Sequence, residues 1–246
     1  MSLPVFVVPS MSGVKVDETV DLTGDEAWHA VVVRRIRVGQ PVALTDGAGL
    51  RAVCSVTSAA GRALSASVLE VSSVSAPSPR VVVVQAIPKG DRGELAVAML
   101  TEVGVDVVVP WAAARSVAVW RGERAATSLA RWRSSAREAA KQSRRAWFPQ
   151  VADPASTADV VGLLRDAALC VVLHEPASVS LASLDVPTRG DVVIVVGPEG
   201  GISDEELAAF AEVGAESVRL GPTVLRTSTA GVAATAALLT RSIRWA

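Results

Sequence analysis

Residues 191–206 read DVVIVVGPEGGISDEE, and this stretch decides the fold of the chain. Asp191 is followed by an unbroken run of β-branched residues at 192–196, and this pattern over 191–196 predicts a buried strand. A glycine turn at 197–201 follows, and Ser203 before three acidic residues predicts the start of a helix. A turn between strand and helix with so few side chains leaves backbone N–H and C=O groups open to a small ligand.

A second glycine turn follows another predicted strand, 217–220, and reads Leu220-Gly221-Pro222-Thr223-Val224-Leu225-Arg226-Thr227. Neither turn has the G-x-G-x-x-G spacing of a dinucleotide site, and Glu216 lies at the wrong end of its strand to bind a ribose. No Gly-Lys-Ser/Thr follows the glycines, which argues against a P-loop. Taken singly, each turn is equally typical of an ordinary tight turn.

Other β-rich runs alternate with helical stretches, and they lie at 81–86, 105–109 and 169–173. This alternation predicts an α/β fold, with a parallel sheet covered by helices on both faces. Ligands of such sheets bind at the carboxyl ends of the strands, where Leu173, Gly197 and Gly221 fall. We therefore expect these three loops to converge on one pocket.

A Ser/Pro-rich segment, 72–79, has no periodicity and predicts a linker. Before it, alternating runs on both sides of a turn at 46–49 predict a small, mainly β, barrel-like domain with one helix near 25–35. The expected domains are therefore residues 1–75 and 76–246.

The bulk composition, 50% apolar with a net charge of −1, is that of a globular protein. Cys54 and Cys170 lie far apart and are expected to be reduced core residues, and with His29 and His174 as the two histidines no metal site is expected. No apolar run approaches the ~20 residues of a membrane span, and the first residues do not resemble a signal peptide, so we expect a cytoplasmic protein.

The charge is nevertheless uneven, because nine basic and two acidic residues lie between positions 115 and 145. If this segment is a helix, two stripes of side chains run along it. One stripe is apolar or small and consists of Leu129, Trp132, Ala136, Ala140 and Ser143. The other is basic and consists of Arg133, Arg137, Lys141 and Arg144. The first stripe is expected to pack. The second is expected either to bind RNA phosphates or to form a solvated face.

The two glycine turns, together with Thr229-Ala230, resemble the signature of the trefoil-knotted (SPOUT) RNA methyltransferases, and most closely that of the bacterial 16S rRNA uridine-N3 methyltransferase family. The similarity continues in the family's order over nearly the whole chain, through residues 24–35, 89–92, 101–105, 115–116 and 137–144. The family commonly has arginine at Thr223, glutamate at Ser228 and leucine at Arg34.

The resemblance implies a deep trefoil knot in residues 76–246 and a PUA-like RNA-binding domain in residues 1–75. It also implies S-adenosyl-methionine (SAM) as cofactor, a homodimer, and methylation of uridine N3 in 16S rRNA of the small ribosomal subunit. Two alternatives stay open. One is a knotted enzyme acting on another base or on a ribose 2′-hydroxyl, and the other is a non-catalytic RNA-binding assembly factor.

The resemblance also implies site residues. The expected cofactor-binding residues are Leu173, Gly197, Pro198, Glu199, Gly200, Gly201, Leu220, Gly221, Leu225 and Thr227. The expected RNA-binding residues are His29, Arg35, Lys89, Arg92, Arg115, Arg137, Lys141, Gln142 and Arg144. For catalysis, Arg226 is expected to stabilise charge on the uracil oxygens and Glu199 to accept the N3 proton. Structural roles stay open as well: a helix cap or dimer contact for Arg226, support of the turn for Glu199, and packing for His29.

Overall fold

The computed structural model describes residues 3–245 and divides into two compact units. Unit 1 holds the residues up to Ala76 together with Lys141–Phe148, and unit 2 holds Pro77–Ala140 and the residues from Pro149 onward. The two domains expected from the sequence, residues 1–75 for RNA binding and residues 76–246 for methyl transfer, stay a prediction.

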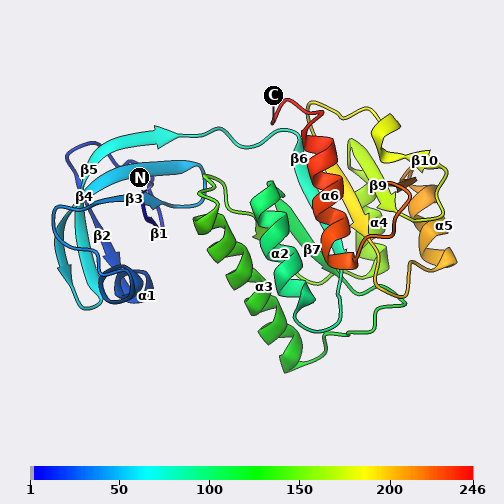
Figure 1. Ribbon diagram of the computed structural model, residues 1–246, viewed down its shortest axis with the longest axis horizontal. Helices are drawn as coiled ribbons and strands as arrows, with labels where there is room; N and C mark the ends of the chain where they lie inside the picture. Colours follow the sequence, from blue (N-terminus) through cyan, green and yellow to red (C-terminus); the bar gives the residue numbers. More distant parts are fainter. Residues whose placement is uncertain (1–2, 246) are drawn as a thin grey trace. The chain divides into compact units, whose positions relative to one another are not determined.

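Unit 2 is built on a seven-stranded parallel sheet (Figure 1). The strand order is β10-β12-β9-β11-β6-β7-β8. The strands are β6 (Arg80–Ala86), β7 (Val107–Trp111), β8 (Gln150–Val151), β9 (Leu169–Leu173), β10 (Val179–Ser180), β11 (Asp191–Val196) and β12 (Glu216–Arg219). The expected α/β fold with a parallel sheet is therefore confirmed.

Helices cover both faces of this sheet because its strands are apolar on both sides. The face carrying Val81 and Val83 packs against α2 (Arg92–Val103), α6 (Thr227–Leu239) and the apolar stripe of α3 (Glu123–Gln142). The face carrying Val82 and Val84 packs against α4 (Thr157–Arg165) and α5 (Asp204–Glu212). A short 3₁₀ helix spans Leu181–Ser183. None of the helices within residues 3–245 is both long and apolar enough to cross a bilayer.

The apolar stripe predicted for the basic helix is largely confirmed, since Leu129, Trp132, Ala136 and Ala140 are buried. Ser143 is the exception: α3 ends at Gln142, and Ser143 is exposed. The residues of α6 that are buried include Thr227, Ser228, Gly231, Ala234, Thr235, Leu238 and Leu239. One face of α6 thus packs within the subunit.

Three of the predicted strands begin at other residues than expected. The strand expected at 81–86 begins one residue earlier, at Arg80. The strand expected at 105–109 begins at Val107, because Val105 lies just past the Gly104 C-cap of α2 and its N–H donates back to the carbonyl of Leu100 in that helix. The last strand covers 216–219, one residue earlier than expected. The two-residue strands β8 and β10 are too short to show a periodic pattern.

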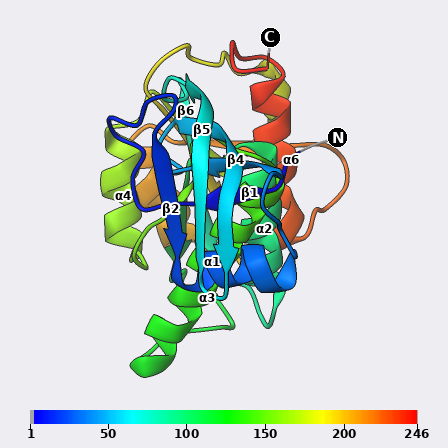
Figure 2. The same ribbon diagram turned by 90° about the vertical axis from the view of Figure 1, so that its left-hand side faces the viewer.

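Unit 1 is a five-stranded sheet in the order β1-β3-β4-β5-β2, in which β2, β5 and β4 lie side by side (Figure 2). Its strands are β1 (Val5–Val7), β2 (Thr19–Thr23), β3 (Pro41–Thr45), β4 (Leu50–Ala60) and β5 (Ala63–Ser73). The register of β4 against β5 shifts twice, and such bulges bend a sheet and increase its twist. The expected mainly β unit is confirmed, and its helix, α1 (Gly24–Trp28), continues into a π-helix, His29–Val33.

The segment 141–148, which begins with the last two residues of α3, packs within unit 1. The Lys141 ammonium lies 2.9 Å from a carboxylate oxygen of Glu26, and the Trp147 indole N–H donates to the carbonyl of Val74 at 2.8 Å. The backbone of Phe148 donates to the carbonyl of Gly47. The turn predicted at 46–49 thus receives this segment, an arrangement that the local sequence pattern does not reveal.

Both cysteines are free and buried, as expected. Burial raises the pKa of the Cys54 thiol to about 11 and raises that of Cys170 as well. Because the thiolate is the reactive form, we predict that neither of the two thiols reacts with a disulfide reagent at pH 8 in the native protein and that both react after denaturation. Rapid labelling of Cys54 in the native state would contradict this prediction.

Candidate functional site

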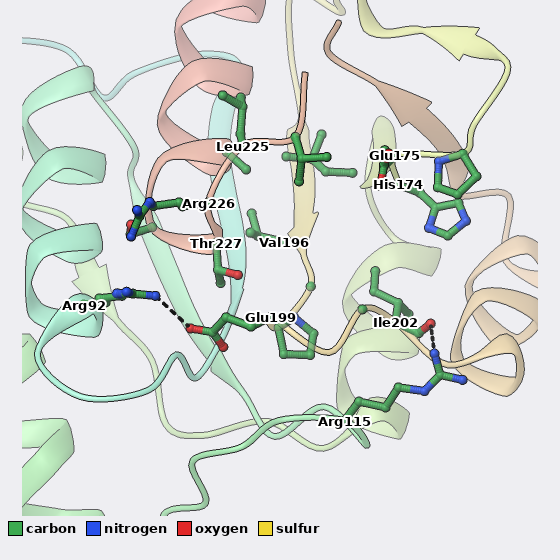
Figure 3. A pocket seen from close by; sticks show the side chains of 18 of the residues that line it. Arg92, Arg115, His174, Glu175, Val196, Glu199, Ile202, Leu225, Arg226 and Thr227 are labelled. Carbon is green, nitrogen blue, oxygen red and sulfur yellow. Dashed lines mark hydrogen bonds and ion pairs between the residues drawn. The ribbon is translucent and has the colours of Figure 1, made fainter. Parts of the chain in front are cut away.

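A cavity of about 550 Å³ opens at the carboxyl ends of β9 and β11 and beside the start of α6 (Figure 3). Its lining includes Leu173 and Val196 from the strand ends, the turn after β11, and residues 224–228. Its charged groups are balanced, with Arg92, Arg115 and Arg226 against Glu175, Glu199 and Asp204. The volume and the mixed lining are those of a small-ligand site.

The turn after β11 needs glycine at two positions for two different reasons. A Cβ on Gly200 would lie 2.9 Å from the carbonyl oxygen of Arg115, so only glycine permits this approach of the two loops. Gly201 has φ +76° and closes the turn by donating to the carbonyl of Pro198 at 2.9 Å. The space beside Gly201 holds no heavy atom within 4 Å of where a Cβ would lie, which leaves its backbone uncovered.

Glu199 joins this turn to the loop after β6. One carboxylate oxygen lies 3.9 Å from a guanidinium nitrogen of Arg92 and 3.4 Å from the backbone nitrogen of Lys89, which donates to it. The Glu199 side chain is 31% exposed, so it is both anchored and reachable from the cavity. In Figure 3, Glu199 points toward Arg92 on the side of the cavity where Arg226 also lies.

Arg226 occupies the N-cap position of α6 through its backbone, whose carbonyl accepts from the N–H groups of Thr229 and Ala230 at 2.9 Å each. Its side chain is exposed, lines the cavity, and forms no ion pair or hydrogen bond with any residue between 3 and 245. The backbone of the next residue, Thr227, is held by the buried Gln85 side-chain amide, which donates to the carbonyl of Thr227 at 3.3 Å. A fixed backbone thus carries an unpaired guanidinium into the cavity.

A buried carboxylate ties the Arg115 loop to the glycine turn. Glu206, only 4% exposed, accepts from the backbone N–H of Ala114 at 2.8 Å, from the hydroxyl of Thr157 at 3.1 Å and from the N–H of Ser203 at 3.0 Å. Arg115, the residue after Ala114, donates to the carbonyl of Ile202 at 3.4 Å. The loop is therefore held beside the cavity at Ala114 and Arg115.

We predict that Glu206→Ala lowers the free energy of unfolding by about 2 kcal/mol or more, because it leaves the N–H groups of Ala114 and of the buried Ser203 without their acceptor and removes the capping box of α5. Chemical denaturation measures this loss. Asp159→Ala is the matched control, since Asp159 closes an equivalent capping box on α4 but is exposed and contacts only Ser156 there. Equal losses in the two variants would contradict the role assigned to the Ala114 contact.

Most of the residues expected to bind the cofactor line the cavity: Leu173, Gly197, Pro198, Glu199, Gly201, Leu225 and Thr227. Leu220 and Gly221 line a smaller adjoining cavity of about 90 Å³ that shares Leu173 and Leu225 with the first. Gly200 packs behind the turn against Arg115. The expected convergence on one pocket is confirmed for Leu173 and Gly197, which line the same cavity, while Gly221 lines the adjoining smaller one.

The residues expected to bind RNA are divided among several places. Arg92 and Arg115 line the cavity, and Lys89 touches Glu199 through its backbone. Arg137, Gln142 and Arg144 are exposed at the end of α3 and just beyond it. The side chains of Lys141 and His29 are less available: Lys141 is buried against Glu26, and the His29 ring lies edge-on to Phe6 at 6.2 Å between centroids. The RNA roles of these residues stay predictions.

His174 and Glu175 also line the cavity, across from Arg226 in Figure 3, and sequence reasoning did not assign them to the site. The sequence did contain a feature that points to them, because both residues directly follow the predicted strand 169–173, whose carboxyl end was expected to face the ligand. No group of three or more His, Cys, Asp or Glu side chains suited to a metal ion occurs among residues 3–245.

Comparison with known proteins matches both units. Residues 75–239 match an RNA methyltransferase domain, and residues 22–69 match the PUA domain of RNA methyltransferases. A parallel α/β unit with its cavity at the strand ends, coupled to a small β unit, thus defines the class: a SPOUT-type RNA methyltransferase.

The relatives narrow this class. The chain is 47% identical to ribosomal RNA small subunit methyltransferase E of Mycobacterium tuberculosis over 90% of this chain and 86% of the relative, and 32% identical to that of Bacillus subtilis over 89% of each. The crystal structure of the Neisseria gonorrhoeae protein of the same name, bound to S-adenosyl methionine, superposes with a TM-score of 0.86 at 29% identity over 97% of this chain and 98% of that one. The chain belongs to the ribosomal RNA small subunit methyltransferase E family.

Proposed function

We propose that this protein transfers a methyl group from SAM to N3 of a uridine in 16S rRNA of the small ribosomal subunit. The observation that carries the proposal is the cavity where two glycine turns meet an unpaired arginine at the strand ends. Relatives at 47% and 32% identity are named for small-subunit rRNA methylation, and a third is bound to SAM. The choice of uridine N3 rests on the family resemblance of the sequence.

The residues around the cavity fit SAM. The uncovered backbone at Gly201 and Gly221 offers polar groups without side chains in the way, and Leu173, Val196 and Leu225 offer apolar surface for an adenine ring. Charged groups of both signs are available for the ammonium and carboxylate of the methionine part. When bound, SAM supplies an electrophilic methyl group on a sulfonium sulfur.

The remaining chemistry falls to side chains of this chain. Uridine N3 carries a proton at neutral pH, and as that proton leaves, negative charge spreads onto O2 and O4. The guanidinium of Arg226 has no partner in the described part of the chain, so it is free to stabilise this charge. Glu199 accepts the proton, since its carboxylate reaches the cavity.

If Glu199 is the base, Glu199→Gln lowers turnover by about 100-fold or more at saturating SAM, because an amide cannot accept the proton. Steady-state kinetics and calorimetric SAM binding separate this effect from a structural one. Arg92→Ala is the matched variant, as it removes the partner that holds Glu199 while keeping the carboxylate. Equal turnover in Glu199→Gln and the unsubstituted protein would assign Glu199 to support of the turn.

The other expectations complete the proposal. Residues 76–246 act as the knotted methyltransferase domain and residues 1–75 as the RNA-binding domain, in a cytoplasmic homodimer. The exposed basic side chains Arg35, Arg92, Arg115, Arg137 and Arg144 bind RNA phosphates, which predicts salt-dependent affinity.

The choice of ribosomal RNA is tested by offering purified protein and methyl-labelled SAM three substrates: small subunits, large subunits and transfer RNA, each from cells lacking the modification. We expect label in the small-subunit RNA alone. Label confined to transfer RNA or to large subunits would contradict the proposal.

A further inference from the structure

A second candidate surface lies on unit 1. The side chains displayed by residues 28–38 are unusually apolar and basic for exposed positions. Trp28 is 45% exposed, Val33 51% and Val38 62%, and Arg34, Arg35 and Arg37 are exposed beside them. We call these six residues the Trp28 surface.

The three arginines of this surface are not neutralised. No acidic residue occurs from position 27 to position 45. Within residues 3–245, none of the three guanidinium groups forms an ion pair or a side-chain hydrogen bond, whereas Arg62 and Lys141 of the same unit pair with Asp25 and Glu26. A cluster of unpaired guanidinium groups attracts a polyanion.

The backbone presents these side chains in a fixed and unusual way. His29–Val33 form a π-helical turn, and Arg35 has φ +55°, a conformation that costs a non-glycine residue about 1–2 kcal/mol. The N–H of Arg34 donates to the carbonyl of His29 at 2.8 Å, and that of Ile36 to the carbonyl of Ala30 at 3.0 Å. The His29 ring packs on Phe6, which anchors the turn to the core. Both π-turns and such strain concentrate at functional sites.

An exposed indole, followed within ten residues by three exposed guanidinium groups, matches the chemistry of unpaired RNA. Unstacked bases bind by stacking on aromatic side chains while cationic groups hold the phosphates, and bases in a duplex do not offer their faces in this way. An acidic protein would satisfy the arginines but would leave the flat apolar indole without a specific partner.

We infer that the Trp28 surface binds an unpaired segment of the RNA substrate, with one base stacked on Trp28 and the adjoining phosphates held by Arg34, Arg35 and Arg37. The inference rests on the proposed function, because it takes RNA as the substrate. It adds that unit 1 distinguishes single-stranded from duplex RNA.

The test compares full-length variants by fluorescence anisotropy, without cofactor, against a labelled single-stranded RNA oligonucleotide and the same sequence as a duplex. Trp28→Ala is expected to weaken single-strand binding by about tenfold or more and to leave duplex binding unchanged. Trp28→Phe should restore most of the affinity. Arg34→Glu with Arg35→Glu should weaken binding and lower its salt dependence by roughly 0.7 per lost phosphate contact.

Trp245→Ala is the control for removing an exposed indole, since Trp245 is 49% exposed and lies in unit 2; its affinity should match that of the unsubstituted protein. Equal single-strand affinity of Trp28→Ala and the unsubstituted protein would overturn the inference. So would dissociation of an oligomer by Trp28→Ala in light scattering, which would make the surface a contact between copies of the chain. RNA binding is measured here without methyl transfer, so the two proposals fail separately. If the protein transfers no methyl group but Trp28→Ala still weakens its binding to single-stranded RNA, the proposed function is contradicted and this inference holds.

Discussion

Arg226→Ala is expected to lower turnover by about 100- to 1,000-fold while leaving the affinity for SAM nearly unchanged. The substitution keeps the backbone carbonyl that begins α6 and removes only an exposed guanidinium that lines the cavity. A group that acts on the uracil oxygens as charge develops contributes mainly to the transition state, so its loss appears in turnover and not in cofactor binding.

Single-turnover kinetics with saturating RNA measures this change, and calorimetry measures SAM affinity. Arg165→Ala is the control, since Arg165 is an exposed arginine at the end of α4 that lines neither cavity. Light scattering on Arg226→Ala separates catalysis from a dimer contact. An unaltered turnover would remove Arg226 from the catalytic role, and a change of molecular mass would assign it to the interface.

Gly201→Val is expected to weaken SAM binding by at least about 100-fold, the loss that follows from misplacing two backbone hydrogen bonds at roughly 1.4 kcal/mol each. Gly201 has φ +76°, which a β-branched residue does not tolerate without strain, and its backbone borders the cavity. Isothermal titration calorimetry measures the loss.

Gly214→Val is the matched control because it introduces the same kind of strain outside the cavity: Gly214 has φ +85°, and no heavy atom lies within 4 Å of where its Cβ would be. Both variants should melt at similarly lowered temperatures, and Gly214→Val should bind SAM normally. Normal SAM affinity in a folded Gly201→Val protein would show that the glycine turn is not part of the cofactor site.

The fold was predictable where the strands are long and uninterrupted. The strands at 169–173 and 191–196 are found with the predicted bounds, because each is a continuous apolar run between a polar or small residue and a turn. The strand expected at 105–109 was displaced because Val105 completes the core around α2 and is apolar for that reason. The trefoil knot stays an expectation of the resemblance, as periodicity carries no information on how a chain threads.

The site was predictable where it depends on backbone turns and less so where it depends on distant side chains. The strand-end rule placed Leu173 and Gly197 in one cavity and Gly221 in the adjoining one, and extending it by two residues would have added His174 and Glu175. No local pattern indicates that Lys141 pairs with Glu26, which lies 115 residues away, or that Glu206 supports the Arg115 loop. Such contacts are set by tertiary packing.

The reaction proposed for this protein is methyl transfer to uridine N3 of small-subunit rRNA. It is tested most directly by incubating the protein with methyl-labelled SAM and small subunits lacking the modification, digesting the RNA and identifying the labelled nucleoside by mass spectrometry. We expect labelled 3-methyluridine. Label on another base or on a ribose would contradict the assigned acceptor, and no label despite measured binding of SAM and RNA would contradict the enzyme itself.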